Sequence, residues 1–253
     1  MPQYLASTGT LWGTAYQDAA GNAIAIPQTV KFGVMQDAVV DISYETKHLM
    51  GQGQFPVASG RFNGKIACSA KFAKVEAALY NSLFFGQTLT TGLTADVVEL
   101  TGALIPTTPF TITPTVPSSG TWSVDLGVLN ASGLAMTKVA SAPATGQYSV
   151  AAGVYTFAAA DTGLRVFINY QYTATVANAK KMTITNILAG TAPEFIADLT
   201  IPFGGKQFMI RLHSCIASKL SFATKMGDFI IPDFSFDAKA DSSDNVISMS
   251  SSE

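Results

Sequence analysis

The residues best suited to metal or nucleophilic chemistry are few and scattered. The sequence holds two histidines, His48 and His213, and two cysteines, Cys68 and Cys215. A zinc site built from such residues needs a local pair of ligands to anchor it. Only His213 and Cys215 come near one another, on the same expected strand face, and two residues do not make a site. We interpret both as ordinary structural residues of a strand and predict no metal site.

The two cysteines lie far apart in the sequence and form no CxxC pattern. Free cysteines are among the most buried residue types, and disulfides are rare in a reducing cytoplasm. Two buried thiols are therefore the simpler interpretation, with a disulfide between Cys68 and Cys215 as the alternative.

Three glycine-containing segments resemble nucleotide-binding loops only superficially. Residues 60–65 (GRFNGK) are one residue too short for a phosphate loop, and Ile66 stands where a magnesium-binding hydroxyl is required. Residues 204–206 (GGK) fail for the same reason, and residues 51–53 (GQG) lack the third glycine of a dinucleotide fingerprint. No GxSxG nucleophile elbow occurs either.

Four spaced acids, Asp233, Asp237, Asp241 and Asp244, lack the glycine and the closing glutamate of a calcium loop. We expect them to be solvent-facing acids on an edge strand and its exit. With no candidate nucleophile, phosphate loop or metal site, the sequence predicts a protein that is not an enzyme and needs no cofactor.

Charged residues are scarce for a chain of 253 residues. They make up 13% of the sequence, against about 25% in an average soluble protein, and the mean hydropathy is positive. The net charge is −2, and the basic residues form no cluster of the kind that binds nucleic acid. So little charge indicates that either a membrane or other subunits cover much of the surface.

The membrane alternative is not favoured. The best apolar run, residues 150–160, is far shorter than the roughly 20 residues that a spanning helix needs. The amino-terminal MPQYLASTGT has no basic residue before an apolar stretch, so we expect no secretory signal. Self-assembly is therefore the favoured explanation of the low charge.

Apolar and polar residues alternate with a period of two in segments that Gly, Pro and Ser residues separate. This pattern predicts a mainly β protein. In residues 165–173, the alternating Val166, Ile168, Tyr170 and Tyr172 are expected to share one face. The Ser-rich end, residues 248–253, is expected to fray. The expected strands are 31–41, 60–68, 110–116, 121–126, 134–139, 147–157, 165–173, 181–187, 195–202, 207–214 and 229–239.

One helix is expected within residues 69–85, its main part at about 70–85. Phe72, Val75, Leu79 and Leu83 recur at spacings of three and four, which places them on one helical stripe. Ser69 is expected to cap the first turn, and Gly86 to stop the helix. Such a helix should pack its stripe against a sheet face, closing one side of a sandwich or barrel.

A change in composition predicts the domain organisation. Residues 89–175 are rich in Thr, Ala and Pro, and between Lys74 and Arg165 the only basic residue is Lys138. We predict a small β module at 89–175, inserted into a main β domain of residues 1–88 and 176–253.

The order of segments carries a family resemblance. Residues 41–86 read DISYETKHLMGQGQFPVASGRFNGKIACSAKFAKVEAALYNSLFFG, and the chain closes with a late strand (residues 228–241) and a short polar tail. This order resembles the tail tube proteins (major tail proteins) of long-tailed bacteriophages. The resemblance covers roughly residues 1–88 and 176–253, and the middle segment departs from the minimal subunit of that family.

The resemblance implies a β-sandwich or barrel of the tail tube type with one flanking α-helix. It further implies hexameric rings stacked into a hollow tube, with DNA as transient cargo in the lumen and no membrane partner. The location would be the virion tail, after synthesis in the bacterial host cytoplasm, and the other partners would be the tape measure, terminator and baseplate proteins. A capsid decoration or receptor-binding virion protein is the main alternative. A carbohydrate-binding sandwich, resting on Trp12, Trp122 and the tyrosines, is a weaker one.

The connection between the strands 31–41 and 60–68 is expected to hold the contact site. Residues 43–59 make it far longer than the two to five residues of a common hairpin turn, and its apolar residues among glycines need a cover. The glycines are expected to permit unusual backbone angles, and the proline to stiffen the return. In the resembled family a loop at this position bridges subunits and rings. The expected contact residues are Leu49, Met50, Gly51, Gly53, Phe55, Pro56 and Val57.

Overall fold

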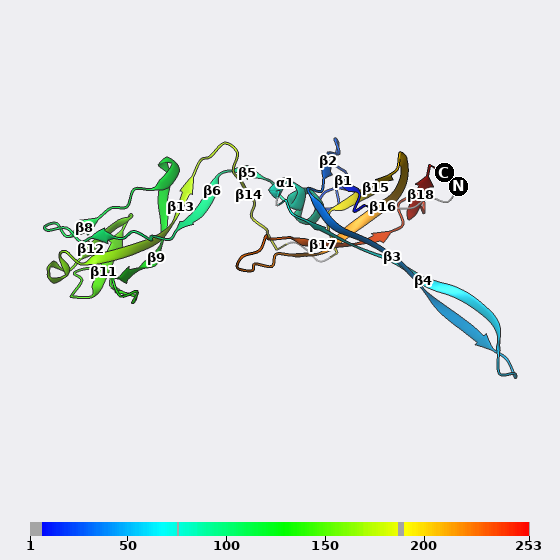
Figure 1. The fold of residues 1–253 in the computed structure, drawn as a ribbon, viewed down its shortest axis with the longest axis horizontal. Helices are drawn as coiled ribbons and strands as arrows, with labels where there is room; N and C mark the ends of the chain where they lie inside the picture. The colour runs from blue at the N-terminus through cyan, green and yellow to red at the C-terminus, as the bar shows by residue number, and fades with distance from the viewer. Residues whose placement is uncertain (1–6, 75, 187–189, 253) are drawn as a thin grey trace. The chain divides into compact units, whose positions relative to one another are not determined.

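The computed structural model describes residues 7–74, 76–186 and 190–252. The chain divides into two compact units: unit 1 holds residues 1–89 and 182–253, and unit 2 holds residues 90–181. Both units are mainly β, with one short α-helix in unit 1 (Figure 1). None of the helices in this described part of the chain has the length and apolar character needed to span a bilayer.

Unit 1 is built on one eight-stranded antiparallel sheet. The strand order is β2-β1-β15-β16-β17-β4-β3, and β18 pairs with β16 off this path. The strands are β1 (Thr10–Gln17), β2 (Thr29–Lys31), β3 (Met35–Met50), β4 (Pro56–Phe72), β15 (Glu194–Phe203), β16 (Lys206–Ser221), β17 (Asp233–Lys239) and β18 (Ile247–Ser251).

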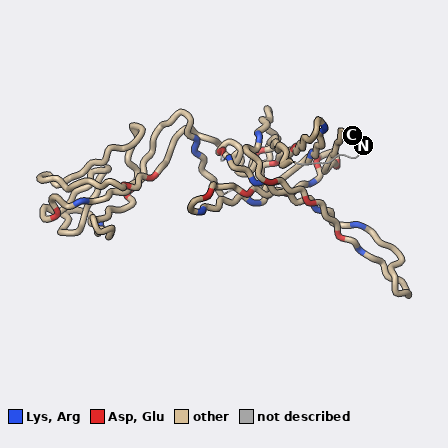
Figure 2. The backbone as a smooth tube through the Cα atoms, viewed as in Figure 1, with Lys and Arg blue, Asp and Glu red and all other residues tan. Residues whose placement is uncertain are grey.

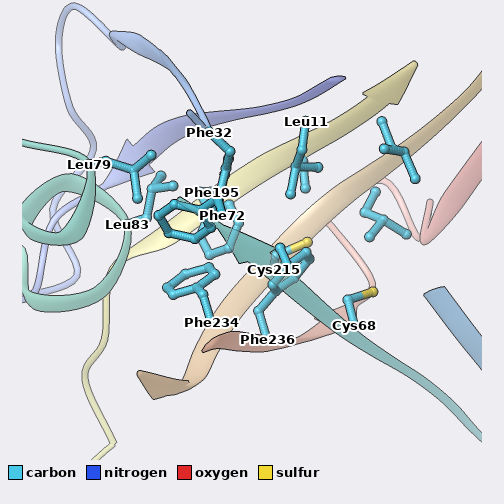
Figure 3. Packing of buried hydrophobic residues seen from close by; sticks show 14 of the residues in the cluster. Leu11, Phe32, Cys68, Phe72, Leu79, Leu83, Phe195, Cys215, Phe234 and Phe236 are labelled. Atoms are coloured by element: carbon cyan, nitrogen blue, oxygen red, sulfur yellow. The ribbon is translucent and has the colours of Figure 1, made fainter. Parts of the chain in front are cut away.

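Phenylalanine rings form the centre of the unit 1 core. Phe32, Phe72, Phe195 and Phe234 are all fully buried, and Figure 3 shows them gathered between the strands. The ring centroids of Phe32 lie 5.2 Å from Phe72 and 5.5 Å from Phe234, within the range of favourable aromatic pairs. Because β1, β4, β15, β16 and β17 all contribute side chains to this cluster, one face of the sheet encloses the core.

The helix is shorter than the sequence predicted. It consists of α1 (Ala77–Tyr80) and the π-helical turn η1 (Asn81–Phe85). Ser69 and Phe72 lie in β4 instead, where Ser69 pairs with Val39 and Ser235, and the residue preceding the helix, Glu76, makes no side-chain cap. The predicted start is wrong because β4 is paired on both sides, and those long-range hydrogen bonds outweigh a local helical pattern. Val75 lies outside the described residues.

The end of the helix and its packing agree with the prediction. Gly86 ends the helix in the left-handed conformation, with φ of 60°, which glycine adopts without a steric penalty. The buried Asn81 closes the same end, because its Nδ2 donates to the carbonyl oxygen of Gln87 and its Oδ1 accepts from the Gln87 N–H. Leu79 and Leu83 are buried in the unit 1 core, so the helix covers one end of that core.

Several other strand predictions need correction. Residues 248–251 of the Ser-rich end are not frayed, because β18 pairs with β16 from Ile247 to Ser251, and residue 253 lies outside the described residues. Residues 229–232 precede β17 and do not form a strand. Within residues 181–186, only Lys181 belongs to a strand, β14 (Lys180–Lys181). Residue 187 lies outside the described residues.

Unit 2 consists of two four-stranded sheets that share one hydrophobic core, and a two-stranded ladder of β5 and β14. The first sheet has the order β10-β11-β12-β8, and the second is β6-β13-β7 with β9 also paired to β13. As predicted, β13 buries Val166, Ile168, Tyr170 and Tyr172 on one face. The elements are β5 (Thr90–Thr91), β6 (Leu93–Val97), β7 (Ala103–Leu104), β8 (Thr111–Ile112), η2 (Pro117–Ser119), β9 (Thr121–Asn130), β10 (Thr137–Lys138), β11 (Gln147–Ala151), β12 (Val154–Phe157), η3 (Ala159–Asp161), β13 (Arg165–Ala174) and β14.

The apolar run that the sequence predicted as one strand, residues 147–157, is a hairpin. The chain reverses at Ala152 and Gly153, both with positive φ, and Ala151 pairs with Val154. Two-residue turns of this kind match the twist of the strands they join. Folding the run back on itself places Tyr148, Tyr155 and Phe157 together in the unit 2 core.

One carboxylate joins the two four-stranded sheets of unit 2. Asp125 lies on β9, and its side chain is only 4% exposed. It accepts hydrogen bonds from the hydroxyls of Tyr148 and Tyr155 at 2.9 and 3.1 Å, and Lys138 Nζ lies 2.9 Å away. These three partners come from β11, β12 and β10 of the opposite sheet. Burial by itself would raise the pKa of the Asp125 carboxyl, but the hydrogen bonds and the Lys138 charge outweigh it, so the pKa lies below its usual value.

We expect Leu79→Ala to lower the free energy of unfolding by about 2–5 kcal/mol, the usual cost of emptying a buried leucine site. Leu79 is 1% exposed within the unit 1 core. The melting temperature of the subunit should fall accordingly. Ile26→Ala is the control, because Ile26 is 79% exposed and should change little. Equal melting temperatures for both variants would show that the helix does not stabilise the core.

We expect the stability of unit 2 to depend on the charge of Asp125. A carboxyl whose pKa is lowered by folding stabilises the protein above its unfolded pKa, near pH 4, and loses that effect as the pH falls through the folded pKa. Asp125→Asn should therefore lower the free energy of unfolding by about 1–3 kcal/mol at pH 7 and flatten its pH dependence below pH 4. Denaturant unfolding from pH 2 to pH 7 measures both effects. An equal acid dependence in the two proteins would contradict the assignment.

Candidate functional site

The feature of unit 1 with the clearest potential for contact is a two-stranded ribbon formed by β3 and β4. These strands pair from Met35 and Phe72 to Met50 and Pro56, whereas β17 covers β4 only from Ile66 to Lys71. Residues 43–50 and 56–65 therefore leave the sheet as a ribbon to which no third strand of the described residues pairs, as Figure 1 shows. At about 3.3 Å per residue, the ribbon extends roughly 25 Å beyond the sheet.

This geometry corrects the prediction of a long connection at residues 43–59. Only residues 51–55 form the turn, because β3 runs to Met50 and β4 begins at Pro56. Gly51 and Gly53 do not adopt positive φ, so unusual backbone angles are not their role. Gly51 instead allows a close approach, since a Cβ there would lie 2.5 Å from Val57 Cγ2, while Gly53 stands in open space.

The predicted contact residues all lie at or beside the tip of the ribbon. Their apolar side chains are highly exposed: 66% for Leu49, 57% for Met50, 81% for Phe55 and 73% for Val57. Residues 49–60 carry no charged side chain, and the tip of the tube in Figure 2 is accordingly uncoloured by charge. We call Leu49, Met50, Phe55 and Val57 the tip surface. These exposed apolar side chains lie at the end of an extended arm.

Side chains along the ribbon stiffen it. Lys47 Nζ lies 5.6 Å from the ring centroid of Phe62, and the Arg61 guanidinium lies 5.5 Å from that of Tyr44, within the distance of cation–π attraction. His48 Nδ1 and Ser59 Oγ form a cross-strand hydrogen bond of 2.7 Å. These contacts keep the two strands together where no sheet supports them.

A second exposed apolar surface of unit 1 was not predicted from the sequence. Residues 222–232 connect β16 to β17 without regular structure. Phe222 packs against Tyr80 with ring centroids 5.4 Å apart, and Pro232 is fully buried, so both ends of the connection are anchored. Between them Met226 is 97% exposed and Phe229 is 89% exposed. We call this segment the β16–β17 surface.

A polar cluster lies where β1, β15, β16 and β17 meet. The hydroxyl of Tyr16 donates to Glu194 Oε2 at 2.7 Å and contacts Ser214 Oγ at 2.8 Å, and Lys239 forms an ion pair with Glu194. Burial raises the pKa of Tyr16 to about 12. Burial would raise the pKa of Glu194, but its bonds to Lys239 and Tyr16 lower it overall. The neutral phenol of Tyr16 and the ion-paired carboxylate of Glu194 therefore link the strands that meet here.

His213 belongs to a separate group that links β16 to β18. His213 Nε2 hydrogen-bonds with Ser248 Oγ at 2.7 Å, and His213 Nδ1 lies 3.6 Å from Asp241 Oδ2. Ser248, His213 and Asp241 follow one another in the order of a Ser-His-Asp triad. The distance between His213 and Asp241 is, however, longer than that of a hydrogen bond. Asp241 Oδ1 already accepts the N–H groups of Ser243 and Asn245. The group thus fastens β18 and the turn before it onto the sheet.

Of the residues considered from the sequence for metal chemistry, His213 and Asp241 lie close together, but they do not form a metal site. A bulge in the pairing of β15 with β16 shifts the alternation, so Leu212 and Cys215 both face the core. His213 and Cys215 therefore do not share a face. The acids Asp233 and Asp237 lie on β17, which is paired on both sides and is not an edge strand. In the described part of the chain, no group of three or more His, Cys, Asp or Glu side chains is placed to hold a metal ion.

Comparison of the chain with protein-family models and with curated proteins finds no match. A function for the chain must therefore be inferred from the arrangement of unit 1 and from the exposure of its surfaces.

We expect both thiols to be unreactive in the folded subunit. Cys68 and Cys215 are free and buried, as the simpler interpretation of the sequence predicted. Burial raises the pKa of Cys68 to about 12, and it raises the pKa of Cys215 as well. Because the thiolate is the reactive form, maleimide should label neither cysteine until denaturant is added, as mass spectrometry can measure. Rapid labelling of either thiol under native conditions would contradict this prediction.

Proposed function

We propose that this chain is a structural virion protein, the subunit of a phage tail tube. Copies assemble into hexameric rings, and the rings stack into a conduit for DNA. The observation that carries the proposal is the β3–β4 ribbon, an arm that leaves the sheet and ends in the exposed tip surface. An isolated two-stranded ribbon is marginally stable in water, so an arm of this length is best explained by a partner that supports it.

The outer edge of the sheet gives the second support. β3 is sixteen residues long and forms the end of the sheet, with no strand paired on its outer side among the described residues. A long free edge promotes uncontrolled association between chains. A closed ring of subunits covers such edges and stops growth at a fixed number of copies.

The distribution of charge gives the third support. Charged residues amount to 13% of the sequence, and Figure 2 shows both signs dispersed along the backbone with no basic cluster. A conduit must let DNA slide, and a surface without clustered Lys and Arg lacks the phosphate contacts that hold DNA in place. The low charge also agrees with broad burial between subunits.

Electron microscopy of the purified protein tests the proposal directly. We expect hexameric rings or tubes, with light scattering showing self-association at high protein concentration across ordinary salt. Each subunit contact should bury on the order of 1,600 Å² in total. A uniform monomer under all these conditions would contradict the proposal. Trimers would favour the alternative, a capsid decoration or receptor-binding protein.

We expect Phe55→Asp to abolish assembly and leave the subunit folded. Phe55 is 81% exposed, so a carboxylate costs the isolated subunit little, but it would be buried without a partner in a dry contact. Particle size measures assembly, and the melting temperature measures folding. Phe55→Leu keeps the apolar character and should still assemble. Ile26→Asp places the same charge at an exposed apolar site outside the ribbon and should assemble normally.

Normal tubes from the Phe55→Asp protein would refute the contact assignment. An unfolded Phe55→Asp subunit would show that Phe55 stabilises its own chain instead.

A further inference from the structure

We infer that the β16–β17 surface is the receptor for the tip surface of a second copy of this chain, so that assembly proceeds head to tail. This inference rests on the proposed function and names the two faces that meet. Its occupant is the apolar end of the β3–β4 ribbon, residues 49–57.

The β16–β17 surface has the properties of a receptor. Its ends contact the rest of unit 1 through the Phe222–Tyr80 ring pair and through the buried Pro232, and the segment between them is exposed. Ile230 and Ile231 are also exposed, at 42% and 37%. Such a concentration of large apolar side chains on a connection is unfavourable in water unless another surface covers it. Phe229 and Phe55 would each bury on the order of 150–250 Å² in a contact.

The positions of the two surfaces require different copies to meet. Asp233, where β17 begins, pairs with Lys71 near the end of β4, whereas the ribbon turn precedes Pro56 at the start of β4. The two points are roughly 50 Å apart along one strand. A rigid strand cannot bring its own two ends together, so the tip surface of one copy can reach only the β16–β17 surface of another.

Pairing two different surfaces also satisfies both of them. A two-fold contact between two tips would leave the β16–β17 surfaces exposed, whereas a head-to-tail contact covers both surfaces on every interior copy and repeats into rings or filaments. The charges around the receptor balance, because Asp228 and Asp233 stand against Lys225 and Lys219, and Lys219 Nζ lies 3.9 Å from Asp233 Oδ2. The apolar contact therefore supplies the attraction between the two surfaces.

A mixing experiment with two blocked subunits tests the inference. Phe55→Asp blocks the tip surface and Phe229→Asp blocks the β16–β17 surface, and each protein alone should remain a folded monomer. In an equal mixture, the intact tip of the Phe229→Asp subunit can bind the intact receptor of the Phe55→Asp subunit. Mass photometry should then show one-to-one dimers and nothing larger, because each dimer ends in two blocked surfaces. Ile26→Asp is the matched control and should assemble as the unchanged chain does.

Cross-linking traps the same contact if a single pair is weak. We combine Phe55→Cys with Phe229→Asp in one subunit and Met226→Cys with Phe55→Asp in the other, since the native thiols are buried. Mild oxidation of the mixture should give a disulfide-linked dimer, and either subunit alone should give far less. If the unchanged chain assembles but the mixtures yield neither dimer nor cross-link, the two surfaces do not meet and the inference is overturned. If the unchanged chain does not assemble, the proposed function itself fails.

Discussion

Burial of one face of β4 is the constraint on which the rest of unit 1 depends. Ile66, Cys68, Ala70 and Phe72 alternate into the core, and a shift of one residue would turn all four toward solvent. Their burial therefore fixes the register of β4 against both β17 and β3. Because the same strand continues outward as half of the ribbon, the core also determines which residues reach the tip. The position of Phe55, far from any core residue, is thus set by Phe72 and its neighbours.

The sequence predicted the parts of the fold in which local pattern and long-range pairing agree. In β13, alternate residues are apolar and are also the ones buried between the sheets, so the strand and its inner face were both predictable. The segment from Ser69 to Phe72 shows the opposite case, since Phe72 fits a helical stripe with Leu79 and also fits the alternation of β4. Nothing local to that segment reveals that β17 will pair with it, and pairing decided the outcome.

The sequence predicted which residues form the tip of the ribbon, but it did not predict that two long strands carry them. The apolar residues among glycines at Leu49 to Val57 marked an unusual segment, but both faces of the ribbon are exposed and so show no clean alternation. The β16–β17 surface was hidden for another reason. Its residues Phe229 to Ile231 are β-branched or aromatic and directly precede β17, so they look like the beginning of that strand. Their exposure becomes visible only when the buried Pro232 and the first pair of the strand, at Asp233, are located.

The short ladder of β5 and β14 has a consequence for how a gene for such a chain can evolve. Thr90 and Thr91 pair with Lys181 and Lys180, so the polypeptide leaves unit 1 and returns to it through two adjacent segments. Because unit 2 begins and ends in paired segments, the gene segment that encodes residues 90–181 can be lost, gained or exchanged without interrupting a strand of unit 1. The strands and the phenylalanine core of unit 1 need not change when it does, because unit 2 has a separate core. Natural variation in chain length among proteins with this organisation should therefore concentrate between residues 90 and 181, while the eight-stranded sheet keeps its size.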